Sequence, residues 1–348
     1  MTTATSPVTR RADAFVAGHL PLARAVAARL GTLADEPDEL VRELETGLRS
    51  LADPAYLDEV RRVTPGLTSA LGVRAPLVRP LHAGIRRACR GRPGAALWLA
   101  ERVEREPWLE VRAFAPTLLR LSIEEDPERS WQLIRRMARA ADNWIVVDTL
   151  AAVAALGILL EPIRWAELEQ LVFSPSPWER RFVGSVIASL PYEVLPADRP
   201  RLAGRPALET IGQLIGDADE NVQKALSWAL RNWARVDPAG VGRFLDEQAE
   251  RAAADGDGHR AWVVRDALPA LGREHGARLR ARLAGIRRLH AAPSTSTASQ
   301  ASAAFADLIA TGSTPAIRRF EHRTSDTPDG PIPSAPSATP EPERSLTE

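Results

Sequence analysis

The sequence predicts an all-α fold, a curved HEAT-like helical-repeat solenoid with a concave face. Ala, Leu and Arg, which favour helices, dominate the composition, and only 5% of the residues are aromatic. Apolar residues recur at helical spacing along most of the chain. In addition, similar short segments return at separations of 33 to 43 residues, which is the period of HEAT-type helix pairs.

Apolar periodicity and short breaks at Pro or Gly define the expected helices in chain order. Asp126-Pro127, Ser176-Pro177 and Asp237-Pro238 look like helix starts, with an N-cap followed by Pro in the first turn. The expected ranges are 11–30, 38–51, 54–63, 76–89, 93–106, 109–121, 127–140, 143–158, 164–173, 177–190, 206–216, 220–235, 239–253, 259–272 and 274–289.

The two ends of the chain differ in composition from this helical body. Residues 1–10 are expected to form a disordered tail and residues 11–290 the solenoid. Residues 291–348 are rich in Ser, Thr, Pro and Ala, with four Arg against seven acids, a balance of −3. Few apolar residues could anchor this segment, so we expect a disordered acidic tail with at most a short helix at 301–311.

Five repeated segments begin a helical run, and stacked pairs of this kind give a solenoid. Overlaying them aligns four cations with one acid. Charged side chains at such positions also form structural ladders between repeats, so the cations alone do not define a binding face. The segments are Pro107–Arg112, Asn143–Asp148, Pro177–Arg181, Asn221–Lys224 and Trp262–Arg265.

Composition excludes several classes of protein. The single cysteine, Cys89, rules out a disulfide framework and a cysteine-ligated cluster and fits a reducing compartment. The six histidines are scattered, and no nucleotide-binding glycine pattern appears, so we expect no metal and no cofactor. The longest apolar run, 151–160, is too short to cross a membrane. We therefore expect a soluble, cytoplasmic monomer.

Trp144 and Asp148 form the most distinctive pair in the sequence. In a helix, this spacing of four residues places an indole and a carboxylate one turn apart on the same side. The apolar stripe of this helix, from Val147 to Ile158, lies beside them, so the pair should border a groove. Both groups attract positive charge, which suits a flat cationic ligand.

The helix expected at 220–235 carries a second aromatic residue, Trp228, opposite its apolar stripe. Lys224, the only lysine, lies one turn before it, and Arg231 and Arg235 follow on the same side. An indole among cations matches a phosphate backbone that carries flat groups, although a solvated arginine face is the structural alternative. Arg180 and Arg181 add two cations from the helix at 177–190.

Four motifs between residues 68 and 275 resemble those of the AlkD-type HEAT-repeat alkylpurine DNA glycosylases. The first is Gly72-Val73-x-x-Pro76-x-x-Arg79 and the second is Trp144-x-x-x-Asp148. The others are Trp178-x-Arg180-Arg181 and Val222-Gln223-Lys224-Ala225-Leu226-x-Trp228-x-Leu230-Arg231. Their order and approximate spacing match the family. Three features depart from its pattern: Asn143 where an aromatic residue is expected, an insertion at 191–206, and the two tails.

The resemblance implies that Trp144, Asp148 and Trp228 form a lesion-facing catalytic cleft. It also implies that Arg181 and Arg231 hold DNA phosphates. Such enzymes act on duplex DNA without flipping the damaged nucleotide out. We add the remaining cations of these helices and of the repeat positions to the expected DNA-binding set: Lys224, Arg180, Arg235, Arg112 and Arg265.

The expected function is thus a monofunctional glycosylase that removes cationic N3- or N7-alkylated purines from duplex DNA. Asp148 would stabilise the oxocarbenium ion and place the water. Two alternatives remain open at this point. One is an enzyme dedicated to bulky adducts of a DNA-alkylating natural product, and the other is a non-catalytic DNA-binding or scaffold protein.

Overall fold

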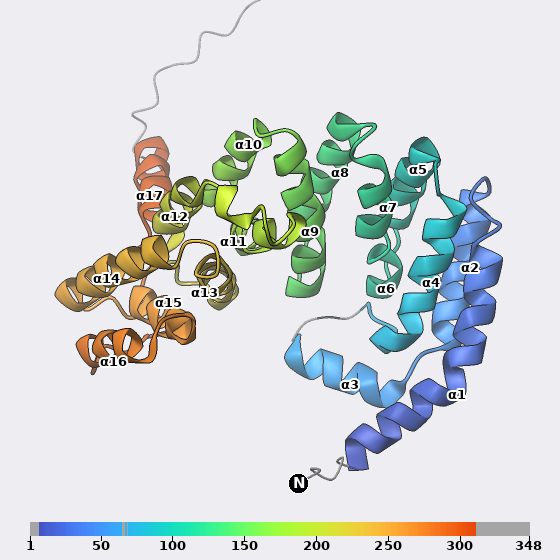
Figure 1. Cartoon of the computed structure of the whole chain (residues 1–348), viewed down its shortest axis with the longest axis horizontal. Coiled ribbons are helices and arrows are strands. Elements are labelled where there is room, and N and C mark those ends of the chain that lie inside the picture. Colours follow the sequence, from blue (N-terminus) through green and yellow to red (C-terminus); the bar gives the residue numbers. More distant parts are fainter. Residues whose placement is uncertain (1–6, 65–66, 68, 311–348) are drawn as a thin grey trace, which may run out of the picture. The chain divides into compact units, whose positions relative to one another are not determined.

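A computed structural model describes residues 7–64, 67 and 69–310, and it confirms the prediction of an all-α helical-repeat fold (Figure 1). Within these residues, β-structure is limited to one isolated bridge between Ala52 and Val73. The helices are α1 (Pro7–Leu30), α2 (Pro37–Ser50), α3 (Pro54–Val63), α4 (Ala75–Ala88), α5 (Pro93–Val103), α6 (Leu109–Arg112), α7 (Ala115–Ser122), α8 (Pro127–Ala140), α9 (Trp144–Leu160), α10 (Arg164–Gln170), α11 (Pro177–Glu193), α12 (Gly204–Leu214), α13 (Glu220–Trp233), α14 (Pro238–Asp255), α15 (Gly258–Ala267), α16 (Arg273–Arg282) and α17 (Thr297–Ala310).

Residues up to Ala306 form one compact unit, in which alternate helices pack side by side. Helices α9, α11, α13 and α15 contact one another in this order, and α8, α12 and α14 pack against their neighbours (Figure 1). The repeated segments identified in the sequence lie at or near the starts of α6, α9, α11 and α13, and within α15.

The predicted apolar stripes form the core. In α9, the stripe from Val147 to Ile158 is buried. In α13, the residues Val222, Leu226 and Trp233 are buried as well. The indole N–H of Trp233 donates to the carbonyl of Ile187 at 2.8 Å, which fixes α13 against α11.

Gly184 allows the close approach of α11 and α13. A Cβ atom at this position would lie 2.9 Å from the Cβ of Ala225 and 3.2 Å from the amide nitrogen of Leu226. Such distances lie inside van der Waals contact, so a larger residue would push the two helices apart. The two helices carry half of the expected site residues, and their spacing therefore sets much of the geometry of the site.

Several helix boundaries differ from the prediction. Helix α1 begins at Pro7, and the run expected at 109–121 is divided into α6 and α7. The solenoid limit expected at 290 falls inside the compact unit, because Thr295 donates from its backbone N–H to the carbonyl of Gly216 at 2.9 Å and Ser296 is fully buried. The expected short helix exists but begins at Thr297. The remainder of the expected acidic tail, 311–348, lies outside the described residues.

Candidate functional site

The carboxylate of Asp148 is held by three donors from α11. The Arg181 guanidinium binds both oxygens, with Nη2 2.7 Å from Oδ2 and Nε 3.1 Å from Oδ1. The hydroxyl of Ser185, one turn further along α11, donates to Oδ1 at 2.7 Å. The Arg181 side chain is 7% exposed and that of Asp148 22%. The acid thus reaches solvent while a nearly buried bidentate cation fixes its orientation.

The start of α9 places Trp144 and Asp148 on one side of the helix. Asn143 caps this helix, since its side-chain oxygen accepts from the backbone N–H groups of Ile145 and Val146 at 3.0 and 3.1 Å. This cap explains the residue that stands where the resembling family has an aromatic side chain. Trp144 itself is half-buried.

Arg181 also connects Asp148 to α13. Its Nη1 atom donates to the carbonyl of Asn221 at 2.7 Å, in the first turn of that helix. Asp219 caps the same turn through the N–H groups of Asn221 and Val222. The Arg181 guanidinium therefore binds both the Asp148 carboxylate and the first turn of α13, the helix that carries half-buried Trp228.

Arg180 and Arg181 do not face solvent as the sequence analysis expected of phosphate-binding residues. Arg180 is 15% exposed and donates to Asp217, which is 1% exposed, at 2.7 Å. Arg181 is bound to Asp148 and Asn221 as described above. Sequence periodicity places both on one helix but does not reveal that Asp217, in the loop before α13, and Asp148, on α9, bind them. A phosphate could replace these carboxylates only by breaking largely buried ion pairs.

The cations of α13 are more exposed. Lys224 is 52% exposed and lies 2.7 Å from Glu220, and this hydrogen bond lowers the pKa of that glutamate. Arg231 is 33% exposed and pairs with Asp266. Arg235 is exposed and donates to the hydroxyl of Tyr192 at 3.1 Å. These three side chains remain available to an anionic partner at the surface.

The two outermost repeat cations pack into the fold. Arg112 is partly buried, and its Nε atom has no hydrogen-bond partner. Arg265 is also partly buried; burial lowers its pKa, and its Nη1 lies 3.4 Å from the carbonyl of Leu283. Both side chains thus fit a structural role between repeats better than a role as solvent-facing phosphate ligands.

The sequence analysis missed a second Trp–Asp pair, Trp262 and Asp266 on α15. Both pairs fit the pattern Trp-x-Val-x-Asp, which was the available signal. Asp266 also accepts from one arginine and one serine on the preceding inner helix, Arg231 and Ser227. The pairs differ at the indole: the guanidinium of Arg288 lies 5.2 Å from the Trp262 ring centroid, whereas among the described residues no cation lies over Trp144.

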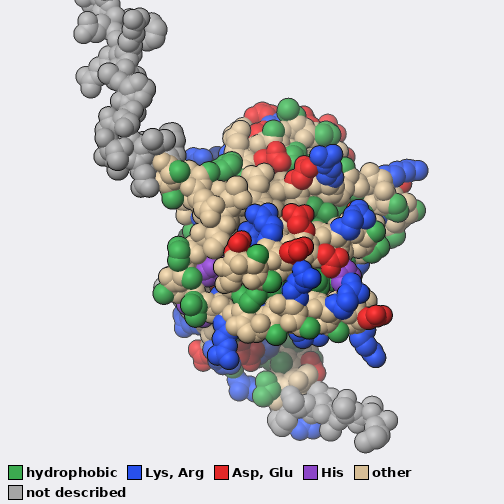
Figure 2. All heavy atoms as spheres, turned by 90° about the vertical axis from the view of Figure 1, so that its left-hand side faces the viewer, with side chains coloured by type: hydrophobic (Ala, Val, Ile, Leu, Met, Phe, Trp, Pro, Cys, Tyr) green, Lys and Arg blue, Asp and Glu red, His purple; other side chains and the backbone are tan. Residues whose placement is uncertain are grey.

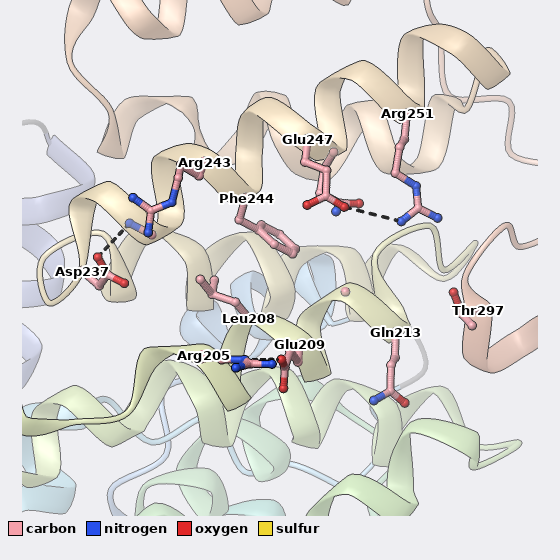
Figure 3. Close-up of a pocket in the computed structure, with 13 residues that line it drawn as sticks. Arg205, Leu208, Glu209, Gln213, Asp237, Arg243, Phe244, Glu247, Arg251 and Thr297 are labelled. Carbon is pink, nitrogen blue, oxygen red and sulfur yellow. Dashed lines mark hydrogen bonds and ion pairs between the residues drawn. The ribbon is translucent and has the colours of Figure 1, made fainter.

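The largest of the described pockets lies elsewhere, between α12 and α14, with a volume of about 710 Å³ (Figure 3). Phe244 and Leu208 form its apolar part, and Arg205 pairs there with Glu209 and Arg251 with Glu247. Figure 2 shows this side of the molecule, where basic and acidic side chains are intermixed. Neither a polyanion nor a cationic base is favoured by such a surface.

The described residues contain neither a candidate metal site nor a candidate membrane-spanning helix. Nowhere in 7–64, 67 and 69–310 do three His, Cys, Asp or Glu side chains gather as a metal ion would require. Within the same ranges, no helix combines the length and the apolar character needed to cross a membrane.

Comparison with known proteins identifies the family of the chain. No curated protein matches the chain. A family model described as DNA alkylation repair enzyme matches residues 44–271, a range that contains both Trp–Asp pairs and all of α4 to α15. This match covers more than half of the chain, and the protein therefore belongs to the DNA alkylation repair enzyme family, which acts on alkylation damage in DNA.

Proposed function

We propose that the protein is a DNA glycosylase that hydrolyses the N-glycosidic bond of cationic N3- or N7-alkylated purines in duplex DNA. The observation that carries this proposal is the solvent-reaching carboxylate of Asp148, which Arg181 and Ser185 orient one helical turn from Trp144, an indole over which no described cation lies. A cationic ligand is attracted by both groups, and the internal cation over Trp262 illustrates the same preference.

The chemistry requires little acid catalysis. An alkylated purine already carries a positive charge, so the electrons of its glycosidic bond neutralise it as it leaves. The sugar becomes an oxocarbenium ion, which the Asp148 carboxylate stabilises. Water then adds to the anomeric carbon and gives up a proton to the carboxylate or to solvent, leaving an abasic site. Trp144 and Trp228 contact the lesion and its sugar through their ring faces.

The roles of the cations differ from those first expected. Arg181 acts as a positioning residue for Asp148, because its guanidinium is nearly buried and bidentate. Lys224, Arg231 and Arg235 remain the DNA-phosphate ligands. Lys224 is the only lysine and is paired with Glu220, so a Schiff-base lyase step has no free amine among the described residues. We therefore propose a monofunctional enzyme.

A preference for bulky adducts is the second candidate function. Ile145, the neighbour of Trp144, lines a hollow of about 300 Å³ together with Tyr56, Val60 and Val78. Its largely apolar wall could take the aromatic body of an adduct whose purine lies at Asp148. An enzyme that does not enclose a flipped base would tolerate such size.

Base release from defined duplexes tests both proposals. The protein would be incubated with duplexes that carry 7-methylguanine, 3-methyladenine or a bulky N3 adduct, and the released base would be quantified. Release of the methylated bases supports the first function, and release of the bulky adduct alone supports the second. Tight duplex binding without release from any of the three would instead identify a non-catalytic DNA-binding protein.

A further inference from the structure

The 191–206 insertion brings an exposed aromatic residue and two arginines together at the ends of α11 and α13. Tyr192 is 50% exposed. The guanidinium of Arg199 lies 5.6 Å from its ring centroid, and Arg235 Nη1 donates to its hydroxyl at 3.1 Å. We call these three residues the Tyr192 cluster.

The cluster is firmly anchored to the core. The Tyr192 hydroxyl donates to the side-chain oxygen of Asn232 at 3.1 Å, and Asn232, which is 5% exposed, donates to the carbonyl of Ala188 at 2.9 Å. The Nε atom of Arg199 donates to the carbonyl of Pro191 at 2.7 Å. An anchored aromatic ring and guanidinium groups lose little freedom on binding, which favours ligand affinity.

The two arginines of the cluster differ from the predicted DNA-binding cations on α11 and α13. Arg180, Arg181, Lys224 and Arg231 each pair with an acid. In the part of the chain that the structure describes, neither Arg199 nor Arg235 forms an ion pair with a carboxylate. The adjacent Glu193 is 8% exposed and is bound by Arg120 of α7 at 2.6 Å. The two positive charges are therefore not neutralised by the protein.

Helix geometry aligns the cluster with the candidate site. Tyr192 lies eleven residues after Arg181, which is about three turns and returns to the same side of α11, about 16 Å further along. Arg235 lies just beyond the end of α13, two residues after Trp233, and its hydrogen bond to the Tyr192 hydroxyl holds it at the end of α11. A DNA strand that runs from Asp148 along these helices would reach the cluster after about five nucleotides, at 3.4 Å per nucleotide.

We propose that the Tyr192 cluster binds phosphodiester groups of the DNA backbone on one side of the lesion, with Arg199 as a contact that the insertion supplies. The proposal rests on the function proposed above and adds a specific backbone contact to it. Phosphate is the ligand that the chemistry favours, because guanidinium groups bind it through paired N–H donors. The tyrosine ring adds a face against which a sugar or base can pack.

Binding of undamaged duplex across a salt series tests the proposal. Each phosphate contact contributes a salt slope of about −0.9, which corresponds to about eightfold in affinity at about 0.1 M salt. Arg199→Ala and Arg235→Ala should each weaken binding by about this factor and reduce the magnitude of the slope by about one. Tyr192→Phe, which removes only the hydroxyl that holds Arg235, should weaken binding less.

Arg205→Ala is the matched control, since Arg205 is 88% exposed, lies between Arg199 and Arg235 in sequence and pairs with Glu209 in the α12–α14 pocket. It removes the same charge and should leave the salt slope unchanged. If Arg199→Ala and Arg235→Ala keep the parent affinity and slope, or if Arg205→Ala matches their losses, the cluster is not a phosphate site. Base release by the parent, measured in parallel, separates the two proposals: its absence overturns the glycosylase function alone.

Discussion

Replacing Asp148 by Asn tests the proposed chemistry most directly. The substitution keeps the size of the side chain but removes the negative charge that would stabilise the oxocarbenium ion. Loss of one such electrostatic group costs about 10²- to 10³-fold in rate elsewhere. We therefore expect a decrease of this size in single-turnover base release, measured at saturating protein with 7-methylguanine duplex. Binding should stay unchanged or tighten, because an acid near phosphate is repulsive.

The structure also predicts a stability cost for this variant. Arg181 is 7% exposed and would lose its counter-charge, and the amide would present a donor to Arg181 or Ser185. Breaking a fully buried pair costs about 3–5 kcal/mol, and the 22% exposure of Asp148 should reduce this to about 2 kcal/mol. Urea denaturation would measure the change, and excision would be assayed where the variant is fully folded.

Two further variants separate chemistry from folding. Asp148→Asn with Arg181→Gln removes both charges and should regain part of the stability while remaining inactive. Asp266→Asn removes an acid with the same kinds of partner beside the covered Trp262 and should excise at the parent rate. Parent-level excision by Asp148→Asn, or an equal loss in Asp266→Asn, would refute the assignment of Asp148.

Other expectations concern packing, pH and the chain end. Gly184→Ala should lower the free energy of unfolding by about 1–3 kcal/mol in urea, whereas Gly94→Ala, with no atom within 4 Å of its added Cβ, should not destabilise the fold. Burial, and then the charge of Arg86, lowers the pKa of His82 to about 4. As pH falls below 6.5, His82 therefore binds a proton in the unfolded chain but not in the folded chain. The free energy of unfolding should decrease by about 3 kcal/mol by pH 4. His82→Gln should flatten this pH dependence, as measured by denaturation at a series of pH values. Removal of 311–348 should leave base release unchanged in the same assay, whereas removal from 291 onward should lower the melting temperature, because Thr295 and buried Ser296 are lost.

The sequence was sufficient to predict the all-α repeat fold, because that fold follows from local patterns. Helical spacing of apolar residues identified the core of α9 and α13. Asp126, Ser176 and Asp237 occupy N-cap positions as predicted, and the two aspartates accept capping hydrogen bonds there, whereas Ser176 does not. Residues 291–310 were misjudged, because the contacts that hold them are polar: serine and threonine groups bind Gly216, far away in sequence. The amino-acid composition of a segment does not predict hydrogen bonds of this kind.

The site was predictable only in part, for a related reason. The Trp144–Asp148 spacing lies within one helix, so the sequence determines it. The ion pairs join residues 33 to 37 positions apart, from Asp148 to Arg181 and from Arg180 to Asp217. Arginine occurs on exposed and buried helix faces alike, since its stem packs while its head binds an acid. Periodicity alone therefore could not separate positioning arginines from phosphate ligands.

The comparison of the two Trp–Asp pairs shows which feature of the site carries functional information. Both carboxylates accept from an arginine and a serine one turn apart, Asp148 from helix α11, which follows it in the chain, and Asp266 from helix α13, which precedes it, so the kinds of donor do not distinguish the two pairs. At Trp262 the fold supplies its own cation, Arg288, whose Nη1 also donates to Gln223 at 2.8 Å. At Trp144 no described cation covers the indole. A cationic alkylpurine would therefore find the required attraction at Trp144, whereas the equivalent ring on α15 is already occupied.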